Sequence, residues 1–324
     1  MSEIIGEIKD LLQQQKTNDV NTISKIGFVG TSRVSCEIIK TASKSGFEVL
    51  AYNKTEGESN KILGTITEML DQEINCWGMT ESEKRLILSR ISVTNHMYDL
   101  ADSDIVIESI SNYRKGTTLE NRRNVLKDIE NVVRNNTVLV SNSSTIMVSE
   151  LASVLTNPSR LIGIHFISPI STANIVELVR SQYTDDKSYN YALRFLKMLQ
   201  KEAIEIAESP GNVSSRMNCI IINQACEILM EGVATIENID EIMKVSMGSQ
   251  YGPFELADKI GLNKLQRQMD NLYDEFGVQI FKCSSIIRRL VRSGKMGKES
   301  GQGFYKYDSN GKIIGTSVTF SEIM

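Results

Sequence analysis

The chain has 324 residues, and 41 % of them are hydrophobic. A single core stops growing at about 250–300 residues, so this chain is long enough for two. Its net charge of −4, from 36 basic and 40 acidic residues, does not indicate a nucleic-acid-binding protein. No stretch approaches the roughly 20 apolar residues of a membrane span, and residues 1–16 lack the apolar segment of a secretory signal.

The five cysteines form neither a metal pattern nor a disulfide framework. They are odd in number and scattered, and no CxxC pair occurs among them. We interpret them as free thiols that mostly fill the core, and we expect a cytoplasmic protein without a metal. They are Cys36, Cys76, Cys219, Cys226 and Cys283.

Residues 1–22 are expected to form an N-terminal helical extension, because isoleucine and leucine recur there at helical spacing. A helix packed on the domain surface explains this pattern more readily than a partner-binding arm.

Strands and helices alternate in the segment that follows. An apolar run at 25–29, a helical segment at 33–45 and a second run at 47–52 predict one βαβ unit. Further short apolar runs, separated by helical segments, occur at 105–107, 138–140 and 161–164. This alternation predicts an α/β Rossmann-type domain over residues 23–208, with a doubly wound parallel sheet.

The remainder, residues 209–324, is predicted to be an all-α C-terminal domain. No strand is expected after about residue 208, and Pro210-Gly211 marks a break near the boundary. Helices are expected at 214–234, 238–247, 253–259, 263–276 and 284–293.

The segment GFVGTSRVS, residues 27–35, stands where a dinucleotide-binding domain usually reads GxGxxG. The three glycines permit a tight turn, close approach to the pyrophosphate and close helix–strand packing. Gly30 takes the first position, but Ser32 and Ser35 take the other two, so the motif alone is weak. Ser35 would push the helix slightly off the strand. The cofactor contacts expected here are Gly30, Thr31, Ser32 and Arg33.

The second strand should end in an acid that binds the ribose 2′-hydroxyl, but Asn53 stands there, followed by Lys54. An amide still binds a hydroxyl, yet it no longer repels a 2′-phosphate. We expect weakened dinucleotide binding and reduced discrimination between NAD and NADP, with NAD as first choice. A Rossmann-shaped domain with weak or lost nucleotide binding is the alternative.

Only two histidines occur, His96 and His165. His96 lies in a polar connection and is expected at the surface. His165 follows the apolar run 161–164, at the carboxyl edge where open α/β sheets bind ligands. A lone histidine is more often structural, so the motifs around His165 decide its interpretation.

Those motifs resemble the 3-hydroxyacyl-CoA dehydrogenase family. NSSTI (142–146), RLIGIHFISP (160–169) and IVELV (175–179) correspond to the family's NTSSL, RFIGLHFFNP and LVEVI. The likeness continues through PGNVSSR (210–216), MGSQYGPFELADKIGL (247–262) and GKMGKESGQGFYKY (294–307). Six motifs in one order, over about residues 24–307, make this resemblance highly specific.

The resemblance implies an NAD-dependent enzyme that interconverts a hydroxyacyl thioester and its oxo form. The family's catalytic histidine falls on His165 and its partner carboxylate on Glu177. The chemistry is consistent with these residue types, because an imidazole can accept the hydroxyl proton near neutral pH. A carboxylate on the other ring nitrogen would fix the tautomer and stabilise the imidazolium.

Other site residues carried over by the resemblance are Ser144 for substrate, and Glu108 and Asn142 beside the cofactor. Ser215 replaces the family's catalytic asparagine, and Asn218, one helical turn later, could supply the missing amide. A catalytically impaired member that acts as a binding or regulatory protein is the competing interpretation.

The distribution of charge bears on the thioester. Residues 61–84, where the family usually carries lysines near the CoA 3′-phosphate, have a net charge of −3. Basic residues lie instead at Lys282, Arg288, Arg289, Arg292, Lys295 and Lys298, and at Arg114, Lys115, Arg122 and Arg123. An acyl carrier protein is acidic and lacks the nucleotide, and family members recruited into polyketide or peptide-antibiotic pathways use carrier-bound substrates. We therefore favour a carrier-bound substrate slightly over CoA, although these charges could also be solvated faces.

In the family, a C-terminal domain of this kind buries its apolar face against a twin. The resemblance therefore implies a two-fold homodimer formed mainly through residues 210–300, with no nucleic-acid or membrane partner.

Overall fold

The structure, a computed structural model, describes residues 23–76, 78–110 and 118–318. The helical extension expected over residues 1–22 lies outside the described residues. The chain forms two compact units: Ser144–Met147 and the segment from Glu208 onward make up the second, and the rest makes up the first. Residues 144–147 therefore pack with the second unit although they lie within the predicted Rossmann-type domain.

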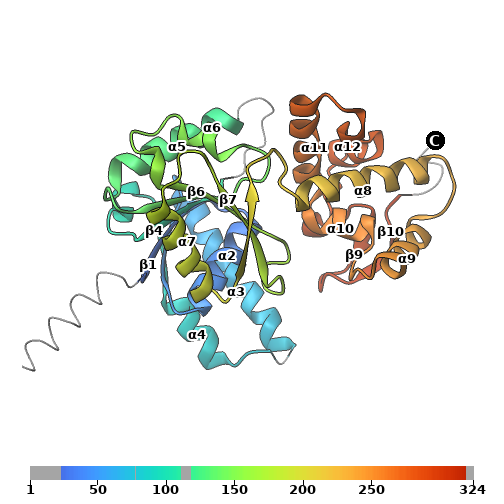
Figure 1. The fold of residues 1–324 in the computed structure, drawn as a ribbon. Helices are drawn as coiled ribbons and strands as arrows, with labels where there is room; N and C mark the ends of the chain where they lie inside the picture. Colours follow the sequence, from blue (N-terminus) through green and yellow to red (C-terminus); the bar gives the residue numbers. More distant parts are fainter. Residues whose placement is uncertain (1–22, 77, 111–117, 319–324) are drawn as a thin grey trace, which may run out of the picture. The chain divides into compact units, whose positions relative to one another are not determined.

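The first unit contains an eight-stranded sheet in the order β3-β2-β1-β4-β5-β6-β7-β8 (Figure 1). Its strands are β1 Lys25–Val29, β2 Glu48–Tyr52, β3 Ile91–Thr94, β4 Ile105–Glu108, β5 Val138–Ser141, β6 Leu161–Phe166, β7 Ile175–Arg180 and β8 Glu202–Ala207. Neighbouring strands are parallel except for β6 and β7, which are antiparallel. The Rossmann-type sheet is confirmed, and β7 departs from the expected parallel pattern.

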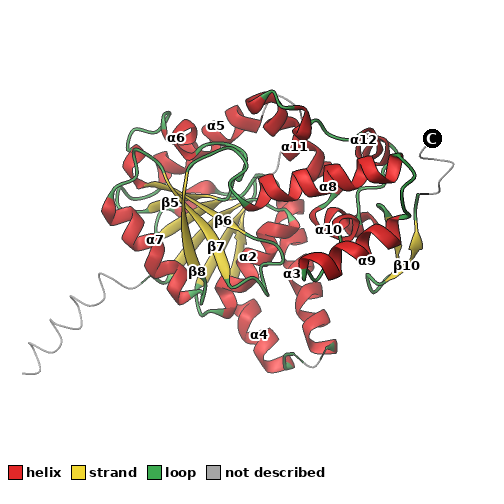
Figure 2. Ribbon diagram, turned by 45° about the vertical axis from the view of Figure 1, so that its right-hand side comes forward, coloured by secondary structure: helices red, strands yellow, loops and turns green. Residues whose placement is uncertain are grey.

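Helices cover the sheet of the first unit (Figure 2). They are α2 Arg33–Lys44, α3 Glu56–Asn75, α4 Glu81–Ser89, α5 Thr118–Val132, α6 Val148–Ala152 and α7 Asp186–Met198, with 3₁₀ turns η1 Met97–Leu100 and η2 Pro158–Arg160. Buried side chains of α2, α3 and α7 share one core with the sheet, where the rings of Phe47 and Phe195 lie 5.5 Å apart. Strands β4 and β5 are buried at every residue, which explains their continuous apolar runs.

Strand order determines where a ligand can bind. The chain runs outward from β1 through β2 to β3, and then returns to β4 on the other side of β1. The carboxyl ends of β1 and β4 therefore form a topological switch point, where open α/β sheets bind their ligands. Gly30, Ser109 and Asn142 all follow strands at this edge.

The second unit is mainly helical, as predicted. It contains α8 Ser214–Met230, α9 Ile236–Met247, α10 Pro253–Ile260, α11 Leu262–Phe276 and α12 Ser285–Arg292, with 3₁₀ turns η3 Gln279–Phe281 and η4 Lys298–Ser300. It also contains an antiparallel hairpin of β9 Tyr305–Tyr307 and β10 Ile313–Thr316, which the sequence analysis did not predict. In the described part of the chain, no helix is both long and apolar enough to cross a membrane.

A buried carboxyl, Asp258 of α10, fastens the start of this hairpin. It accepts hydrogen bonds from the backbone N–H groups of Phe304 (2.8 Å) and Tyr305 (2.9 Å) and from the Tyr307 hydroxyl (3.0 Å). A Cβ on Gly303 would lie 1.9 Å from Asp258 Oδ1, so only glycine fits beside the carboxyl. Burial raises the pKa of Asp258 to about 7.

A second buried carboxyl, Asp240 of α9, joins the same core to α10. It accepts from the N–H groups of Phe254 (2.8 Å) and Glu255 (3.0 Å) and from the Tyr305 hydroxyl (2.9 Å). Burial raises the pKa of Asp240 to about 6. Tyr305 therefore contacts both carboxyls, which ties the hairpin to the helices.

Candidate active site

His165 and Glu177 face each other across β6 and β7. They are direct cross-strand partners in the antiparallel pair, and this places their side chains on the same face. His165 Nδ1 lies 2.6 Å from Glu177 Oε2. The side chain of His165 is 15 % exposed and that of Glu177 is 6 % exposed, so the carboxyl is the more enclosed of the two. His96, by contrast, is exposed.

The contact with Glu177 selects one tautomer of the neutral His165 imidazole. A carboxylate can only accept, so Nδ1 carries the hydrogen of the bond to Glu177. The lone pair of the neutral ring then lies on Nε2, which becomes the basic nitrogen. A proton taken up by Nε2 would give an imidazolium that the neighbouring carboxylate stabilises.

The loop after β1 fits a dinucleotide at its first glycine position. Gly30 has φ +141°, and a Cβ there would lie 2.4 Å from the backbone oxygen of Ser109. The loop therefore passes too close to the end of β4 for any side chain, as a turn that cradles a pyrophosphate requires. The cofactor implied by the fold is compatible with this backbone.

The two serines in glycine positions form a local hydrogen-bond network. Ser32 is the N-cap of α2, and its Oγ accepts from the Ser35 N–H at 3.1 Å. The hydroxyls of Ser32 and Ser35 lie 2.8 Å apart, and Ser35 Oγ donates to the Ser109 oxygen at 3.2 Å. Ser35 is fully buried, so its hydroxyl joins α2 to the end of β4 through this bond. Thr31 and Arg33 flank Ser32.

Asn142 continues this network toward the catalytic pair. Its Nδ2 donates to Ser109 Oγ at 3.1 Å, and its Oδ1 accepts from the Phe166 N–H at 3.1 Å. Phe166 directly follows His165 on β6. Hydrogen bonds therefore connect the loop after β1 to the strand that carries the histidine.

The carboxylate of Glu108 has hydrogen-bond and ion-pair partners within the protein. Its carboxylate accepts from Arg122 Nη1 at 2.7 and 2.6 Å, from the Ile110 N–H at 2.8 Å and from Ser141 Oγ at 3.0 Å. Glu108 is fully buried, whereas the Arg122 side chain is 11 % exposed. Glu108 remains a predicted neighbour of the cofactor, and the ion pair gives it in addition a structural role at the switch point. Nothing in the sequence predicted Arg122 as its partner.

Asn53 follows β2, the strand next to β1. Its Oδ1 accepts from the Thr55 N–H at 3.1 Å, and its backbone N–H donates to Thr94 at 3.0 Å. Asn53 is half-buried and Lys54 is exposed.

Ser144 belongs to the second unit. Its backbone oxygen accepts from the Gly211 N–H at 2.7 Å, and its Oγ lies 3.4 Å from Gln268 Nε2. Thr145 Oγ1 accepts from Asn271 Nδ2 at 3.0 Å. Two side chains of α11 therefore hold the segment that carries Ser144.

Ser215 and Asn218 both lie on α8, where Ser215 is buried and Asn218 is half-buried. Asn212, which is not among the predicted site residues, has φ +47° and is 8 % exposed. Its Nδ2 is a buried donor with no hydrogen-bond partner in the described part of the chain. Only the turn signal Pro-Gly-Asn marked this position in the sequence.

The charge argument against CoA is weaker than the sequence suggested. Glu73 of α3 pairs with Lys40 and, at 3.0 Å, with Lys44, and both lysines lie on α2 outside the 61–84 window. Asp71 pairs with Lys84. The net charge of that window therefore overstates the negative field near α3.

The interpretation of the basic clusters is also corrected. Arg122 is committed to Glu108, Arg123 pairs with Glu120 at 2.7 Å, and Arg288 pairs with Asp270. Lys295 donates to the Ser317 oxygen at 3.1 Å. Arg114 and Lys115 lie outside the described residues. Exposed cations of these clusters include Lys282, Arg289, Arg292 and Lys298.

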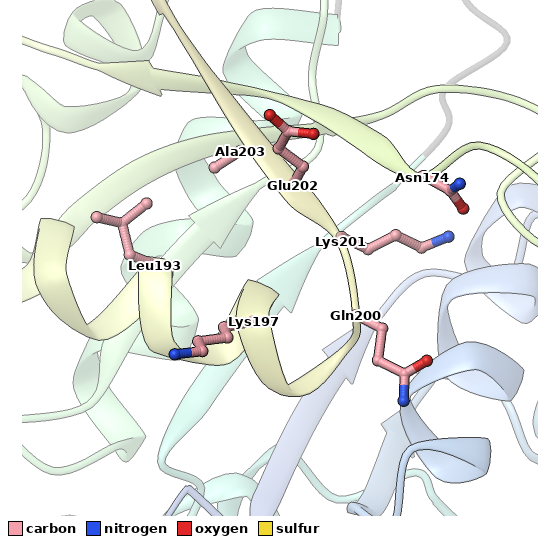
Figure 3. Close-up of a pocket in the computed structure, with 7 residues that line it drawn as sticks. All are labelled: Asn174, Leu193, Lys197, Gln200, Lys201, Glu202 and Ala203. Carbon is pink, nitrogen blue, oxygen red and sulfur yellow. The ribbon is translucent and has the colours of Figure 1, made fainter.

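A hollow of about 610 Å³ lies between the end of α7 and the starts of β7 and β8 (Figure 3). None of the predicted site residues lines it. Lys201, the cation whose side chain extends toward Asn174 in Figure 3, donates to the backbone oxygens of Ile170 and Ala173 at 2.6 Å each. We interpret Lys201 as a structural residue whose two hydrogen bonds hold the loop after His165 in place.

Comparison with known proteins agrees with the geometry. The model of the 3-hydroxyacyl-CoA dehydrogenase NAD-binding domain matches residues 25–209, and that of the C-terminal domain matches residues 211–307. The chain belongs to the 3-hydroxyacyl-CoA dehydrogenase family. The resemblance stated from the motifs is confirmed, and so are the expected enzyme class, an NAD-dependent oxidoreductase, and NAD as cofactor.

Relatives of this family match along nearly their whole length. A probable 3-hydroxybutyryl-CoA dehydrogenase of Bacillus subtilis is 31% identical over 286 residues, covering 88% of this chain and 98% of the relative. The crystal structure of (S)-3-hydroxybutyryl-CoA dehydrogenase from Ralstonia eutropha has a TM-score of 0.76 at 32% identity, and covers 89% of this chain and all of that one. Mycobacterium tuberculosis FadB2 has a TM-score of 0.82 at 26% identity, with the same coverage.

Proposed function

We propose that the chain interconverts a 3-hydroxyacyl-CoA and the corresponding 3-oxoacyl-CoA, with His165 as general base. The observation that carries the proposal is the 2.6 Å contact between His165 Nδ1 and Glu177 Oε2 across paired strands. The relatives that are 3-hydroxybutyryl-CoA dehydrogenases by name support a short 3-hydroxyacyl chain on CoA.

In this proposal, Nε2 of His165 removes the hydroxyl proton of the substrate in the oxidative direction, and Glu177 stabilises the imidazolium that forms. When bound, NAD would supply the acceptor for the hydride that leaves the carbinol carbon. Gly30 allows the pyrophosphate to approach the backbone, and the Ser35–Ser109–Asn142 hydrogen bonds hold the loop in register with β6. Ser144, Ser215 and Asn218 remain predicted substrate contacts, with Asn212 as a further candidate amide.

A carrier-bound hydroxyacyl group is a second candidate substrate. The observation that favours it is the group of exposed cations at Lys282, Arg289 and Arg292 on and beside α12, which would suit an acidic carrier protein. The neutralisation of Glu73 by Lys40 and Lys44 favours CoA instead.

The experiment is to compare kcat/KM of the intact protein for 3-hydroxybutyryl-CoA and for the same acyl group on an acyl carrier protein. We expect CoA to be used at least as well as the carrier-bound form. A carrier-bound preference of more than about tenfold, worth about 1.4 kcal/mol, would replace the CoA proposal with the second candidate. Failure of both thioesters would contradict each of them.

A further inference from the structure

The side chain of Asn53 has a defined orientation. A backbone N–H can donate only to an acceptor, so its bond from Thr55 identifies the atom facing Thr55 as Oδ1. The Nδ2 group of Asn53 is consequently on the other side of the amide. The acid usual at this position can only accept hydrogen bonds from ribose hydroxyls, whereas Asn53 directs its oxygen toward Thr55 and also carries a donor.

Two cations accompany this donor at the same edge of the sheet. Lys54 follows Asn53, and Arg33 begins α2 after the neighbouring strand β1, whose last residue Val29 pairs with Tyr52. Both cations are exposed, and neither has an ion-pair partner among the side chains that the structure describes.

Two described carboxylates near these elements accept hydrogen bonds from neutral groups of the protein. Glu37, one turn after Arg33 on α2, accepts from the Ile170 N–H at 3.3 Å. Asp99, which follows β3, accepts from the Thr94 hydroxyl at 2.5 Å. Neither occupies the position of the usual acid, which is Asn53.

We propose that Asn53, Lys54 and Arg33 form a site for the 2′-phosphate of NADP(H), so that the enzyme binds NADP(H) as well as NAD(H). A phosphate oxygen only accepts hydrogen bonds, and these three side chains present an amide donor, an ammonium and a guanidinium. The inference rests on the nucleotide-binding fold of the family and is independent of the catalytic role of His165.

The test is calorimetric titration of the intact protein with adenosine 2′,5′-bisphosphate and with adenosine 5′-monophosphate. Neither probe carries a nicotinamide ring, so the readout does not depend on turnover. We expect the bisphosphate to bind about tenfold more tightly, and this preference to fall as salt rises. Asn53→Asp should abolish the preference, because its carboxylate repels the 2′-phosphate. Lys54→Gln should weaken only the bisphosphate, by about threefold.

The matched control is Lys25→Gln, which removes a lysine from the amino end of β1, at the opposite edge of the sheet. It should leave both affinities unchanged. Equal affinity for the two nucleotides in the unmodified protein, or failure to bind either, would overturn the proposal. A preference that survives both Asn53→Asp and Lys54→Gln would also overturn it, since the 2′-phosphate would then be bound elsewhere.

Discussion

At the scale of single residues, the fully buried carboxylate of Glu108 depends on Arg122. Their two contacts, at 2.7 and 2.6 Å, supply the only cation paired with Glu108 among the described side chains. Removing one partner of a buried ion pair leaves an uncompensated charge, which costs about 3–5 kcal/mol. We therefore expect Arg122→Gln to lower the free energy of unfolding in urea by about 3 kcal/mol or more.

The control for this prediction is the adjacent Arg123→Gln. Arg123 pairs with Glu120, whose side chain is 64 % exposed, and such exposed pairs contribute about 0–1 kcal/mol. If the two variants unfold at the same urea concentration, the Glu108–Arg122 pair does not have the role assigned to it.

Some residues of the candidate site could be predicted from the sequence, and others could not. His165 and Glu177 could be named because each lies in an extended motif, and the strand pairing brings them into contact. Ser109 could not be named, because its role depends on contacts with Ser35 and Asn142, which are distant in sequence. Residues this far apart in sequence become neighbours only because the strands that precede them end at the same edge of the sheet.

At the scale of elements, continuous apolar runs identified the central strands, whereas β3, β7 and β8 were not predicted. Strand β8 lies at the sheet edge and is only partly buried, so its sequence lacks a long apolar run. The direction of β7 does follow from the length of the connection between β6 and β7. Residues 167–174 separate it from β6, and a parallel crossover needs a dozen or more residues, so the pair must be antiparallel.

The hairpin β9–β10 should respond to pH through Asp258. Burial raises the pKa of this carboxyl from its ordinary 3.8 to about 7, so between these values the folded chain binds more protons than the unfolded chain. Its stabilising effect is therefore complete below 3.8 and is lost as pH rises toward 7. Asp240, with its pKa raised to about 6, acts with the same sign.

Urea unfolding of the wild type and of Asp258→Asn over this pH range measures the effect. The free energy of unfolding of the wild type, relative to the variant, should fall as pH rises. Asp274→Asn, which removes an exposed carboxyl, should follow the wild type at every pH. A relative stability that instead rises with pH would mean that the three donors to Asp258 keep its pKa low.

At the scale of the whole molecule, the second unit exposes apolar side chains that suit an interface. On α9, Val245 is 82% exposed, Ile242 is 61% exposed and Met247 is 55% exposed. Ile242 and Val245 lie one helical turn apart, and exposed apolar surface marks interaction sites in soluble proteins. We therefore predict a homodimer formed mainly through residues 210–300, with α9 in the contact.

Sedimentation at micromolar concentration measures the assembly. Val245→Glu should shift the protein toward monomer, because it would bury a charge in the contact. Ile204→Glu, which changes an exposed side chain on β8 of the first unit, should leave the dimer intact. A wild-type monomer, or a dimer unaffected by Val245→Glu, would count against this interface.

The central claim is that the His165–Glu177 pair carries out proton transfer in an NAD-dependent dehydrogenase. The direct measurement is kcat for NAD reduction by 3-hydroxybutyryl-CoA in wild type, His165→Ala and His96→Ala, with nucleotide binding measured in parallel. His165→Ala should lower kcat by roughly 100-fold or more without loss of nucleotide binding, as expected for removal of a general base. His96→Ala, which changes the exposed histidine, should behave as wild type. Near-wild-type turnover by His165→Ala would contradict the assignment.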